Sequence, residues 1–547
     1  MVRSCPRLRR IALAVGLLLT VSACGGGGSG GGGTPTPAPT PTPTPVTPLI
    51  QTLNNQPPSV GDLAILLTDG SVLIQAAAVS PPSASAGAGI FYRLTPDASG
   101  DYENGTWTRI SSPPTGYAPY AGATAVLPDG RVLFVGGEYN QNNYNIPFAP
   151  SALTNMSAIW DPRTDAWTMI APPAGQAYIG DVASLILPDG RFVYGTKLDK
   201  LMFALDPATL TWSAFPAAGK ADNFAEEGLT LLPSGAVLAV DMANRPHAEH
   251  YVPSLGQWVS DGSTPSDLTS PTDYPSGITY GPAPAQTVGG VTYGPGPTGT
   301  YMPPGEIGPA ILRPDGTVFA TGSAAAGGTG HTAIYTPGAT ITAAGTWVAG
   351  PDFPRGEDAG DSSAALLPSG NVLVAGVTSA LYEFDGSTLS QTVSATATSS
   401  GAPPVFLLPL PAGQTLVLVA GVGVRLYTPS GSAKAAWAPT IATFPATVTR
   451  GATYTVSGTQ FNGLSQAASY GDELNSSTNF PLVRITNSAS GHVVYARTHD
   501  HSTMAVATGA ATVSTKFDVP AGTETGASTL VVVANGVASA GAGVTVN

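Results

Sequence analysis

The chain has 547 residues, including 67 glycines and 52 prolines, and only 10% of its residues are charged. This density of Gly and Pro excludes a mainly helical protein, and a hydrophobic content of 42% excludes intrinsic disorder over most of the chain. The formal net charge is −13, and no basic cluster lies beyond the first ten residues, so we expect no nucleic-acid partner.

Residues 1–23 have the pattern of an export signal. A basic start precedes the apolar run 11–20, and Val21-Ser22-Ala23 leads directly into Cys24. The pattern resembles a bacterial lipoprotein signal, which implies cleavage before Cys24 and a lipid on that cysteine; an ordinary secretory signal is the alternative. We therefore expect an exported lipoprotein that contacts a membrane through its N-terminal lipid, with the membrane and the leaflet left open. The only other cysteine is Cys5, so no disulfide is expected after cleavage.

Residues 24–49 are expected to form a linker. A nearly pure glycine run, 25–33, is followed by the alternating sequence TPTPAPTPTPTPVTP over 34–48. Glycine runs are flexible and Pro-rich runs are extended, so this segment would hold the rest of the chain away from the membrane.

Residues 50–437 contain one unit that can be read seven times. Each unit has two apolar runs joined by a tight turn, then a run near Tyr or Asp-Pro, and in six units a run with Trp. The turns end in glycine, which accepts the positive φ of a tight hairpin: Gly70, Gly130, Gly190, Gly235, Gly316, Gly370 and Gly413. Four strands in each of seven units predict a seven-bladed β-propeller, with the Trp437 run as the last strand of the seventh unit.

Three segments carry a resemblance to a known family: LPDGRVLFVGG (127–137), IWDPRTDAWTMI (159–170) and LLPSGNVLVAG (366–376). They resemble Kelch-type propellers and, among these, bacterial galactose-oxidase-like proteins. The copper oxidases of that family use a tyrosine cross-linked to cysteine, a second tyrosine and two histidines. The propeller region here has no cysteine, and none of those ligands can be carried over. We therefore do not expect a copper-radical oxidase.

Residues 438–547 show short β-branched runs without the repeat, which predicts a small Ig-like β-sandwich. It resembles the early-set or IPT-like domain that follows the propeller in that family. The fold class is thus all-β, with a propeller followed by a sandwich. His499 and His501 would lie on the same side of a strand, and with Asp472 they could bind Zn²⁺ or Cu²⁺; a hydrogen-bonded structural cluster is the alternative.

If the first two strands of a unit are joined by the glycine turn, the loops between the second and third strands and between units emerge on one common face. Two long insertions belong to that face, 138–155 and 261–306. The first offers aromatic rings beside uncharged hydrogen-bonding groups, a combination that suits sugar hydroxyls, and its candidates are Tyr139, Asn140, Asn142 and Tyr144. A solvated or self-packed loop is the alternative for both insertions.

Five of the seven expected innermost strands have a carboxylate eight to ten residues before their turn glycine: Asp62, Asp181, Glu227, Glu306 and Asp361. We expect these side chains to ring the channel mouth on the loop-bearing face. Such a ring repels itself unless a cation or backbone N–H groups compensate it, so Ca²⁺ or a cationic ligand could be held there. Hydrogen bonds to neighbouring blades are the structural alternative.

Taken together, these features favour an envelope-anchored or cell-surface recognition protein whose propeller face binds a glycan or a protein partner. The alternatives are an extracellular carbohydrate-active enzyme that uses a pair of the ring carboxylates, and a structural scaffold of the envelope. The sequence leaves catalysis open and favours binding.

Overall fold

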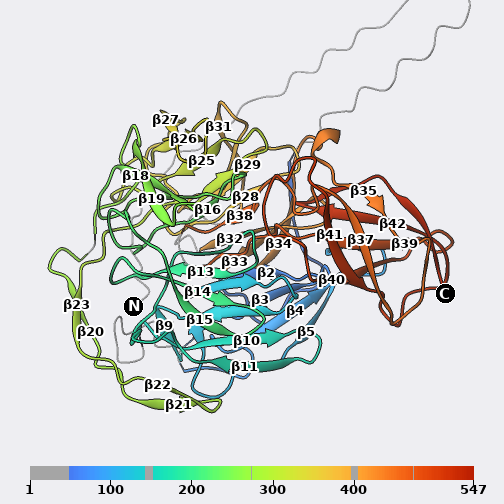
Figure 1. Ribbon diagram of the computed structural model, residues 1–547, viewed down its shortest axis with the longest axis horizontal. Helices are drawn as coiled ribbons and strands as arrows, with labels where there is room; N and C mark the ends of the chain where they lie inside the picture. Colours follow the sequence, from blue (N-terminus) through green and yellow to red (C-terminus); the bar gives the residue numbers. More distant parts are fainter. Residues whose placement is uncertain (1–47, 80, 142–151, 273, 396–403, 472–473) are drawn as a thin grey trace, which may run out of the picture.

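The computed structural model describes residues 48–547, apart from 80, 142–151, 273, 396–403 and 472–473. The expected signal, Cys24 and nearly all of the linker lie outside the described residues. Within that described part, the chain is all-β, with a seven-bladed propeller and a separate C-terminal sheet (Figure 1). None of the helices found there is long and apolar enough to cross a membrane.

The first six blades follow the chain, and in each blade the strands pair in sequence order from the innermost to the outermost. Blades one to three are β2 (Ala64–Leu66), β3 (Val72–Gln75), β4 (Phe91–Thr95) and β5 (Thr106–Arg109); β7 (Ala123–Val126), β8 (Val132–Val135), β10 (Ser157–Asp161) and β11 (Ala166–Ile170); and β12 (Ser184–Ile186), β13 (Phe192–Gly195), β14 (Met202–Asp206) and β15 (Thr211–Phe215). Blades four to six are β16 (Thr230–Leu231), β17 (Val237–Val240), β18 (His247–Val252) and β19 (Gln257–Ser263); β24 (Ala310–Leu312), β25 (Val318–Thr321), β26 (Thr332–Thr336) and β27 (Thr346–Ala349); and β28 (Ala364–Leu366), β29 (Val372–Ala375), β30 (Ala380–Phe384) and β31 (Leu389–Ser394).

The predicted glycine turns join the first two strands of every blade. All seven turn glycines have φ between 75° and 90°, a backbone conformation that L-residues rarely adopt. The second strand of each blade is fully buried because it lies between sheets on both faces, which explains its continuous apolar sequence.

Blade seven closes the ring with a strand from the other end of the chain. It consists of β32 (Val405–Pro409), β33 (Thr415–Val419), β34 (Gly423–Thr428) and β1 (Leu49–Thr52), and β1 pairs antiparallel with β34. The prediction that the Trp437 run would be the outer strand is wrong, because β1 occupies that edge. Trp437 instead ends the short 3-10 helix η2 (Ala435–Trp437) and packs against the turn at Gly370.

The C-terminal part forms one sheet with the order β35-β37-β41-β40-β39-β42-β44-β36, and β43 pairs with β42. It has its own apolar core, built around Val456, Phe461, Val483 and Phe517. The strands are β35 (Thr440–Thr443), β36 (Thr447–Val448), β37 (Thr453–Thr459), β39 (Leu482–Asn487), β40 (Val493–His499), β41 (Val513–Asp518), β42 (Gly526–Ala534), β43 (Val537–Ala538) and β44 (Ala542–Val546). The finer assignment to an Ig-like sandwich stays a prediction.

A segment of the C-terminal part, residues 464–480 without 472–473, which lie outside the described residues, enters the centre of the propeller; we call it the axial segment. Its strand β38 (Ala468–Ser469) adds to the inner edge of β28. Further along, the Ser476 hydroxyl donates to Ala64 O in blade one at 2.5 Å, and the Asn475 amide donates to Ser184 O in blade three at 2.8 Å. The Tyr470 ring stacks on Phe406 in blade seven. The segment therefore ties the innermost strands of several blades together.

The two faces of the propeller have different neighbours. The C-terminal sheet lies on the face of the glycine turns, where Thr498 N donates to Thr68 O at 3.0 Å and Met504 N donates to Pro188 O at 3.0 Å. The opposite face, which we call the loop face, carries the insertions. In Figure 1 the C-terminal strands β39–β42 and the insertion strands β20–β23 lie at opposite sides of the propeller.

The longer insertion arches over blades two and three instead of extending into solvent. It forms two hairpins, β20 (Ile278–Tyr280) with β23 (Gly299–Tyr301) and β21 (Gln286–Val288) with β22 (Val291–Tyr293). Tyr293 Oη donates to Ile170 O at 2.8 Å, and Tyr178 Oη donates to Pro297 O at 2.8 Å. The start of the shorter insertion pairs β6 (Pro119–Tyr120) with β9 (Tyr139–Asn140).

Candidate functional site

The loop face gathers carboxylates and tyrosines around one buried lysine at the mouth of the channel. Lys197 is 2% exposed and follows β13; its Nζ contacts Asp181 and lies 2.5 Å from Glu226 Oε1. We call the surrounding set the mouth cluster; its members are Asp62, Tyr120, Glu138, Tyr139, Asp181, Lys197, Glu226, Tyr301 and Asp361. Removal of one partner from an ion pair this deeply buried would leave an uncompensated charge, which is costly.

The backbone places these carboxylates where the chain turns into the innermost strands. Glu226 and Asp361 have φ of 57° and 47°, and Asp181 follows Gly180, whose φ is 78°. Non-glycine residues in this left-handed region cost free energy, and such residues concentrate at functional sites. The repeated geometry turns side chains of different blades toward the common axis.

Four carboxyl groups at the mouth, those of Asp62, Glu138, Asp181 and Asp361, hold protons more tightly than free carboxyl groups do. The side chain of Asp361 is surrounded by protein atoms but keeps a solvent-accessible surface. Reduced hydration, together with the charges of Glu226 and Asp181, raises its pKa to about 7. Burial raises the pKa of Asp181 to about 6 against the opposing pull of Lys197. Burial and the charge of Asp181 also raise the pKa of Glu138 well above its usual value. The site therefore has groups that change charge near neutral pH.

Three of the carboxylates are paired with tyrosines. Tyr120 Oη donates to Asp62 Oδ2 at 2.5 Å, and Tyr301 Oη donates to Glu226 Oε1 at 3.4 Å. Tyr139 hydrogen-bonds Glu138, and burial raises the pKa of this tyrosine. The Tyr120 and Tyr139 rings are 6.3 Å apart and tilted by 42°, so two aromatic faces stand beside the acidic groups.

Of the five predicted ring carboxylates, Asp62, Asp181 and Asp361 belong to the mouth cluster. Glu227 does not, because its side chain points to another lysine, Lys220. Glu306 lies at the margin, where its backbone N–H donates to Ser270 Oγ at 2.9 Å and its charge acts on Tyr301.

The shorter insertion contributes one of its four predicted binding residues to the site. Tyr139 is half-buried beside Glu138. Asn140 is 1% exposed, and its amide accepts from Ala118 N at 2.8 Å and donates to Gly116 O at 3.0 Å. It therefore fixes the loop and is not available to a ligand. Asn142 and Tyr144 lie outside the described residues.

Sequence reasoning did not single out Lys197 or Tyr120. It noted Glu226 beside Glu227, Glu138 at the start of the shorter insertion and Tyr301 in the longer one, but it did not place them together at the mouth. Glu138 lies three residues after β8 and Lys197 two residues after β13, so a comparison of the residues that follow the second strand of each blade would have drawn attention to them. Tyr301 comes from the long insertion, and its return to the mouth depends on hairpins that the repeat does not predict.

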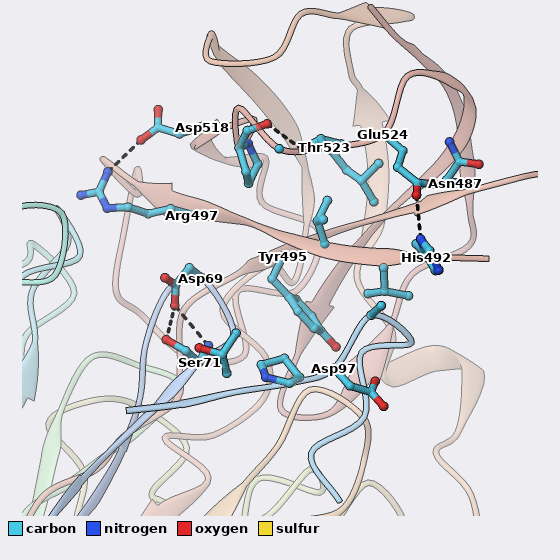
Figure 2. Close-up of a pocket in the computed structure, with 18 of the residues that line it drawn as sticks. Asp69, Ser71, Asp97, Asn487, His492, Tyr495, Arg497, Asp518, Thr523 and Glu524 are labelled. Carbon is cyan, nitrogen blue, oxygen red and sulfur yellow. Dashed lines mark hydrogen bonds and ion pairs between the residues drawn. The ribbon is translucent and has the colours of Figure 1, made fainter. Parts of the chain in front are cut away.

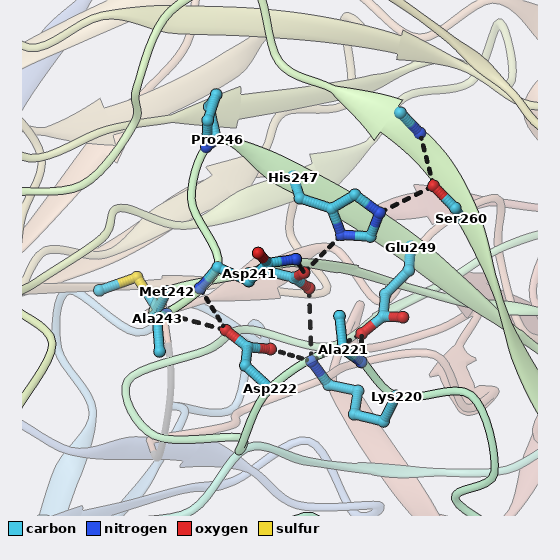
Figure 3. Close-up of polar contacts among 12 residues, drawn as sticks. Lys220, Ala221, Asp222, Asp241, Met242, Ala243, Pro246, His247, Glu249 and Ser260 are labelled. Atoms are coloured by element: carbon cyan, nitrogen blue, oxygen red, sulfur yellow. Dashed lines mark hydrogen bonds and ion pairs between the residues drawn. The ribbon is translucent and has the colours of Figure 1, made fainter.

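A second buried lysine, Lys220, lies in blade four among four carboxylates, and Figure 3 shows it with three of them, Asp222, Asp241 and Glu249. Its Nζ lies 2.6 Å from Asp222 Oδ1, 3.1 Å from Glu227 Oε1, 3.3 Å from Asp241 Oδ1 and 2.8 Å from Glu249 Oε1. This Lys220 cluster borders the mouth cluster, because Glu226 and Glu227 are neighbours in the chain.

His247 and backbone groups close the Lys220 cluster on its outer side. His247 Nδ1 lies 2.5 Å from Asp241 Oδ2, and Asp222 Oδ2 accepts from Ala243 N at 2.8 Å and Asn244 N at 2.9 Å. Among the described residues, two groups of three side chains have possible metal-ligand atoms within 4.8 Å of one another, and both groups belong to this cluster. The first group is Asp241, His247 and Glu249, and the second is Asp222, Glu227 and Asp241. The ammonium of Lys220 already lies among the carboxylates of the second set.

The metal site predicted around His499 and His501 has no support in the described part of the chain. His499 Nε2 lies 3.1 Å from Asp518 Oδ1, while His501 Nδ1 lies 2.9 Å from Thr515 Oγ1. Burial lowers the pKa of His501 to about 3, and its ring stacks on Phe480. Asp472, the predicted third ligand, lies outside the described residues. Both histidines thus hydrogen-bond to side chains of β41 in the C-terminal part, and the metal site stays a prediction.

A cleft of about 560 Å³ lies between blade one and the C-terminal sheet (Figure 2). Most of its charged side chains are paired: Arg93 with Asp69 in blade one, and Arg497 with Asp518 at 3.0 Å and His492 with Glu524 at 2.7 Å in the C-terminal part. Because these charges are neutralised within each part of the molecule, we place the functional site at the mouth cluster.

No family model matches the chain, and no curated protein matches it. Solved β-propellers do match. A fungal alcohol oxidase of the AA5 family in complex with copper is 12% identical, over 91% of this chain and 98% of that chain, with a TM-score of 0.47. An inactive virginiamycin B lyase from Staphylococcus aureus with quinupristin is 10% identical, over 70% of this chain and 99% of that chain, with a TM-score of 0.43. YCF48 bound to a D1 peptide is 13% identical, over 70% of this chain and 96% of that chain, with a TM-score of 0.42. These likenesses concern the fold alone.

Proposed function

We propose that the mouth cluster binds a hydroxyl-rich ligand, a saccharide, and that the chain is an exported recognition protein held at the cell envelope by a lipid on Cys24. The observation that carries the proposal is the set of three tyrosine–carboxylate pairs around the mouth, Tyr120–Asp62, Tyr139–Glu138 and Tyr301–Glu226.

This combination supports saccharide binding for two reasons. A carboxylate accepts hydrogen bonds from sugar hydroxyls through two oxygens, and these bonds are stronger than those between neutral groups. A tyrosine ring offers an apolar face for the C–H side of a sugar ring, while its hydroxyl remains available for hydrogen bonding. Tyr120 and Tyr139 are both partly exposed, so their rings can be reached from the loop face.

The placement of the site also supports a recognition role. The C-terminal sheet covers the opposite face of the propeller, and the mouth cluster is bordered by the two long insertions. Loops on a rigid propeller are the usual positions for binding residues. A Gly-rich and Pro-rich linker before Pro48 would let such a face reach ligands beyond the membrane surface.

A glycan array probed with the full chain, solubilised in detergent, tests this function in the presence of Ca²⁺ or of EDTA. We expect retention on a subset of glycans, and its loss in Tyr139→Ala. Phe444→Ala is the matched control, because it removes an exposed aromatic side chain from the C-terminal sheet. Retention that Tyr139→Ala leaves unchanged, or no retention on any glycan, would contradict the proposal, and the second result would favour a protein partner or a scaffold.

A second candidate function is acid–base catalysis on a saccharide. It is favoured by Asp361 and Asp181, whose charges act on each other and whose pKa values are both raised toward neutral pH, so that the two together bind a proton more readily than free carboxyl groups do. Glycoside hydrolysis uses one protonated and one ionised carboxyl group. Product analysis of each glycan that binds separates the candidates, because only the enzyme releases shorter products and loses that release in Asp361→Asn.

A further inference from the structure

We propose that the ligand of the mouth cluster carries a positive charge, in the form of a primary ammonium group such as that of a 2-amino-2-deoxy sugar. The inference deepens the proposed function and rests on it. It starts from the acidic groups at the mouth, which outnumber the cationic groups there and oppose one another's ionisation.

Carboxylates outnumber cationic groups at the mouth. Asp62, Glu138, Asp181, Glu226 and Asp361 act on one another electrostatically, and Lys197 is the cationic group that lies among them in the described part of the chain. Apart from Lys197, the charges that act most on Asp361 are other carboxylates: Glu226, Asp181 and Asp62. Ionised carboxylates that act on one another in this way repel, so an additional positive charge is favoured at the mouth.

An acceptor within the cluster has no donor. Asp181 is 5% exposed, and while its Oδ2 contacts Lys197, its Oδ1 has no hydrogen-bond partner among the described residues. A buried acceptor without a partner costs about 1–3 kcal/mol, and the large majority of buried polar atoms are paired. Asp361, on the same site, has an exposed side chain. The cluster therefore combines an unused buried acceptor with a carboxylate that solvent and ligand can reach.

Lys197 shows how this site holds an ammonium group. Its Nζ lies between Asp181 and Glu226 and 5.5 Å from the centre of the Tyr301 ring. Three N–H donors of an ammonium suit two carboxylates and a π face. Tyr139 beside Glu138 offers a second aromatic ring next to a carboxylate. An incoming ammonium would find the same chemistry there.

A divalent metal ion suits the mouth less well than an ammonium. Within the described residues, the sets of three ligand atoms that lie within 4.8 Å of one another are in the Lys220 cluster and not at the mouth. Metal sites need several ligand oxygens around one point, whereas an ammonium needs two or three acceptors in separate directions. The Ca²⁺ predicted for this ring is therefore the weaker candidate.

Three oligosaccharides with the same β-1,4 backbone and different groups at carbon 2 test the inference by calorimetry with the full chain at pH 7. They are a glucosamine oligomer with an ammonium, an N-acetylglucosamine oligomer with a neutral amide, and a glucose oligomer with a hydroxyl. We expect the ammonium-bearing oligomer to bind at least tenfold more tightly than both others, and this preference to shrink as salt is raised.

Two variants locate the effect. Asp361→Asn and Glu138→Gln keep the size of each side chain and should reduce the preference, whereas Asp352→Asn, an exposed carboxylate in the same connection between blades five and six, should not. Equal affinity for the three oligomers would overturn the inference and leave the saccharide proposal standing. No binding of any oligomer, with silence on the glycan array, would overturn both.

Discussion

Glu226 and Glu227 are neighbours in the chain, yet their carboxylates bind different buried lysines. Glu226 Oε1 lies 2.5 Å from Lys197 Nζ at the channel mouth, and Glu227 Oε1 lies 3.1 Å from Lys220 Nζ in blade four. The φ of 57° at Glu226 turns the two side chains to opposite sides of the backbone. The mouth cluster and the Lys220 cluster therefore share one rigid peptide, and a change in either is expected to affect the other.

Removal of the Lys220 charge should destabilise the protein strongly. Lys220→Met would leave four buried carboxylates without their common cation, and loss of one partner of a buried ion pair costs about 3–5 kcal/mol. Chemical denaturation measures the free energy of unfolding. Lys434→Met is the control, because Lys434 is exposed, and it should change that free energy by no more than about 0.5 kcal/mol. An equally stable Lys220→Met protein would show that the cluster is not charged as described.

The sequence predicted the propeller well because its turns leave local signals. A Pro-Asp-Gly turn between apolar runs needs only neighbouring residues to form, and all seven turn glycines have the expected positive φ. The outer strand of blade seven could not be found in this way, since β1 pairs with β34 across most of the chain. The Trp437 run has the composition of an outer strand, but β1 already pairs with the free edge of β34.

The site was predicted only in part, because some of its residues are marked by a local pattern and others are brought together only by contacts between distant parts of the chain. Asp62, Asp181 and Asp361 could be found because each lies eight or nine residues before its turn glycine. Lys197 and Tyr301 come from connections of different length, and their meeting depends on long-range folding. Glu227 was named among the ring carboxylates, but its neighbour Glu226, whose φ is 57°, is the residue that contacts Lys197 at the mouth.

Asp361→Asn should stabilise the protein at high pH. The pKa of Asp361 is raised to about 7 in the folded state, above its usual value of 3.8, so the folded state binds the proton more tightly and stability is lost as pH rises toward 7. Because the side chain is exposed and water screens its charge, we expect a gain of only about 1–2 kcal/mol at pH 8.

Urea unfolding from pH 3.5 to pH 8 measures the effect of Asp361→Asn. The difference between variant and parent should be largest at pH 8 and should disappear below pH 4, where the carboxyl is protonated in both states. Asp352→Asn, at an exposed carboxylate, should show no such trend. A difference that is constant over the whole range would mean that Asp361 does not have a raised pKa.

His250 should make stability depend on pH in the region of its own titration. Its Nδ1 lies 2.8 Å from Asp261 Oδ2, which also accepts from Tyr335 Oη at 3.0 Å, and the hydrogen bond to Asp261 raises the pKa of His250. A raised histidine pKa gives stability that is present below about pH 6.5 and is lost as pH rises through the folded-state value.

His250→Gln should therefore cost more at pH 5.5 than at pH 9, with a difference of about 1–2 kcal/mol in the free energy of unfolding. Thermal unfolding followed by circular dichroism at both values measures it. His331→Gln serves as the control, because its partner Asp352 is also an exposed residue, and this pair should contribute little at either pH. If His250→Gln lowered the free energy of unfolding by the same amount at pH 5.5 and at pH 9, His250 would be neutral at both pH values.

The axial segment should depend on the absence of a side chain at residue 228. A Cβ at Gly228 would lie 2.1 Å from Gly471 O, so Gly228→Ala must displace the segment from blade four. We expect residues 464–480 to lose protection in hydrogen–deuterium exchange, and the free energy of unfolding to fall by about 1–3 kcal/mol. Gly522→Ala is the matched control, since a Cβ there meets no atom within 4 Å. Unchanged exchange of residues 464–480 in Gly228→Ala would show that the segment is not seated in the channel, and the tie between the blades would then have to lie elsewhere.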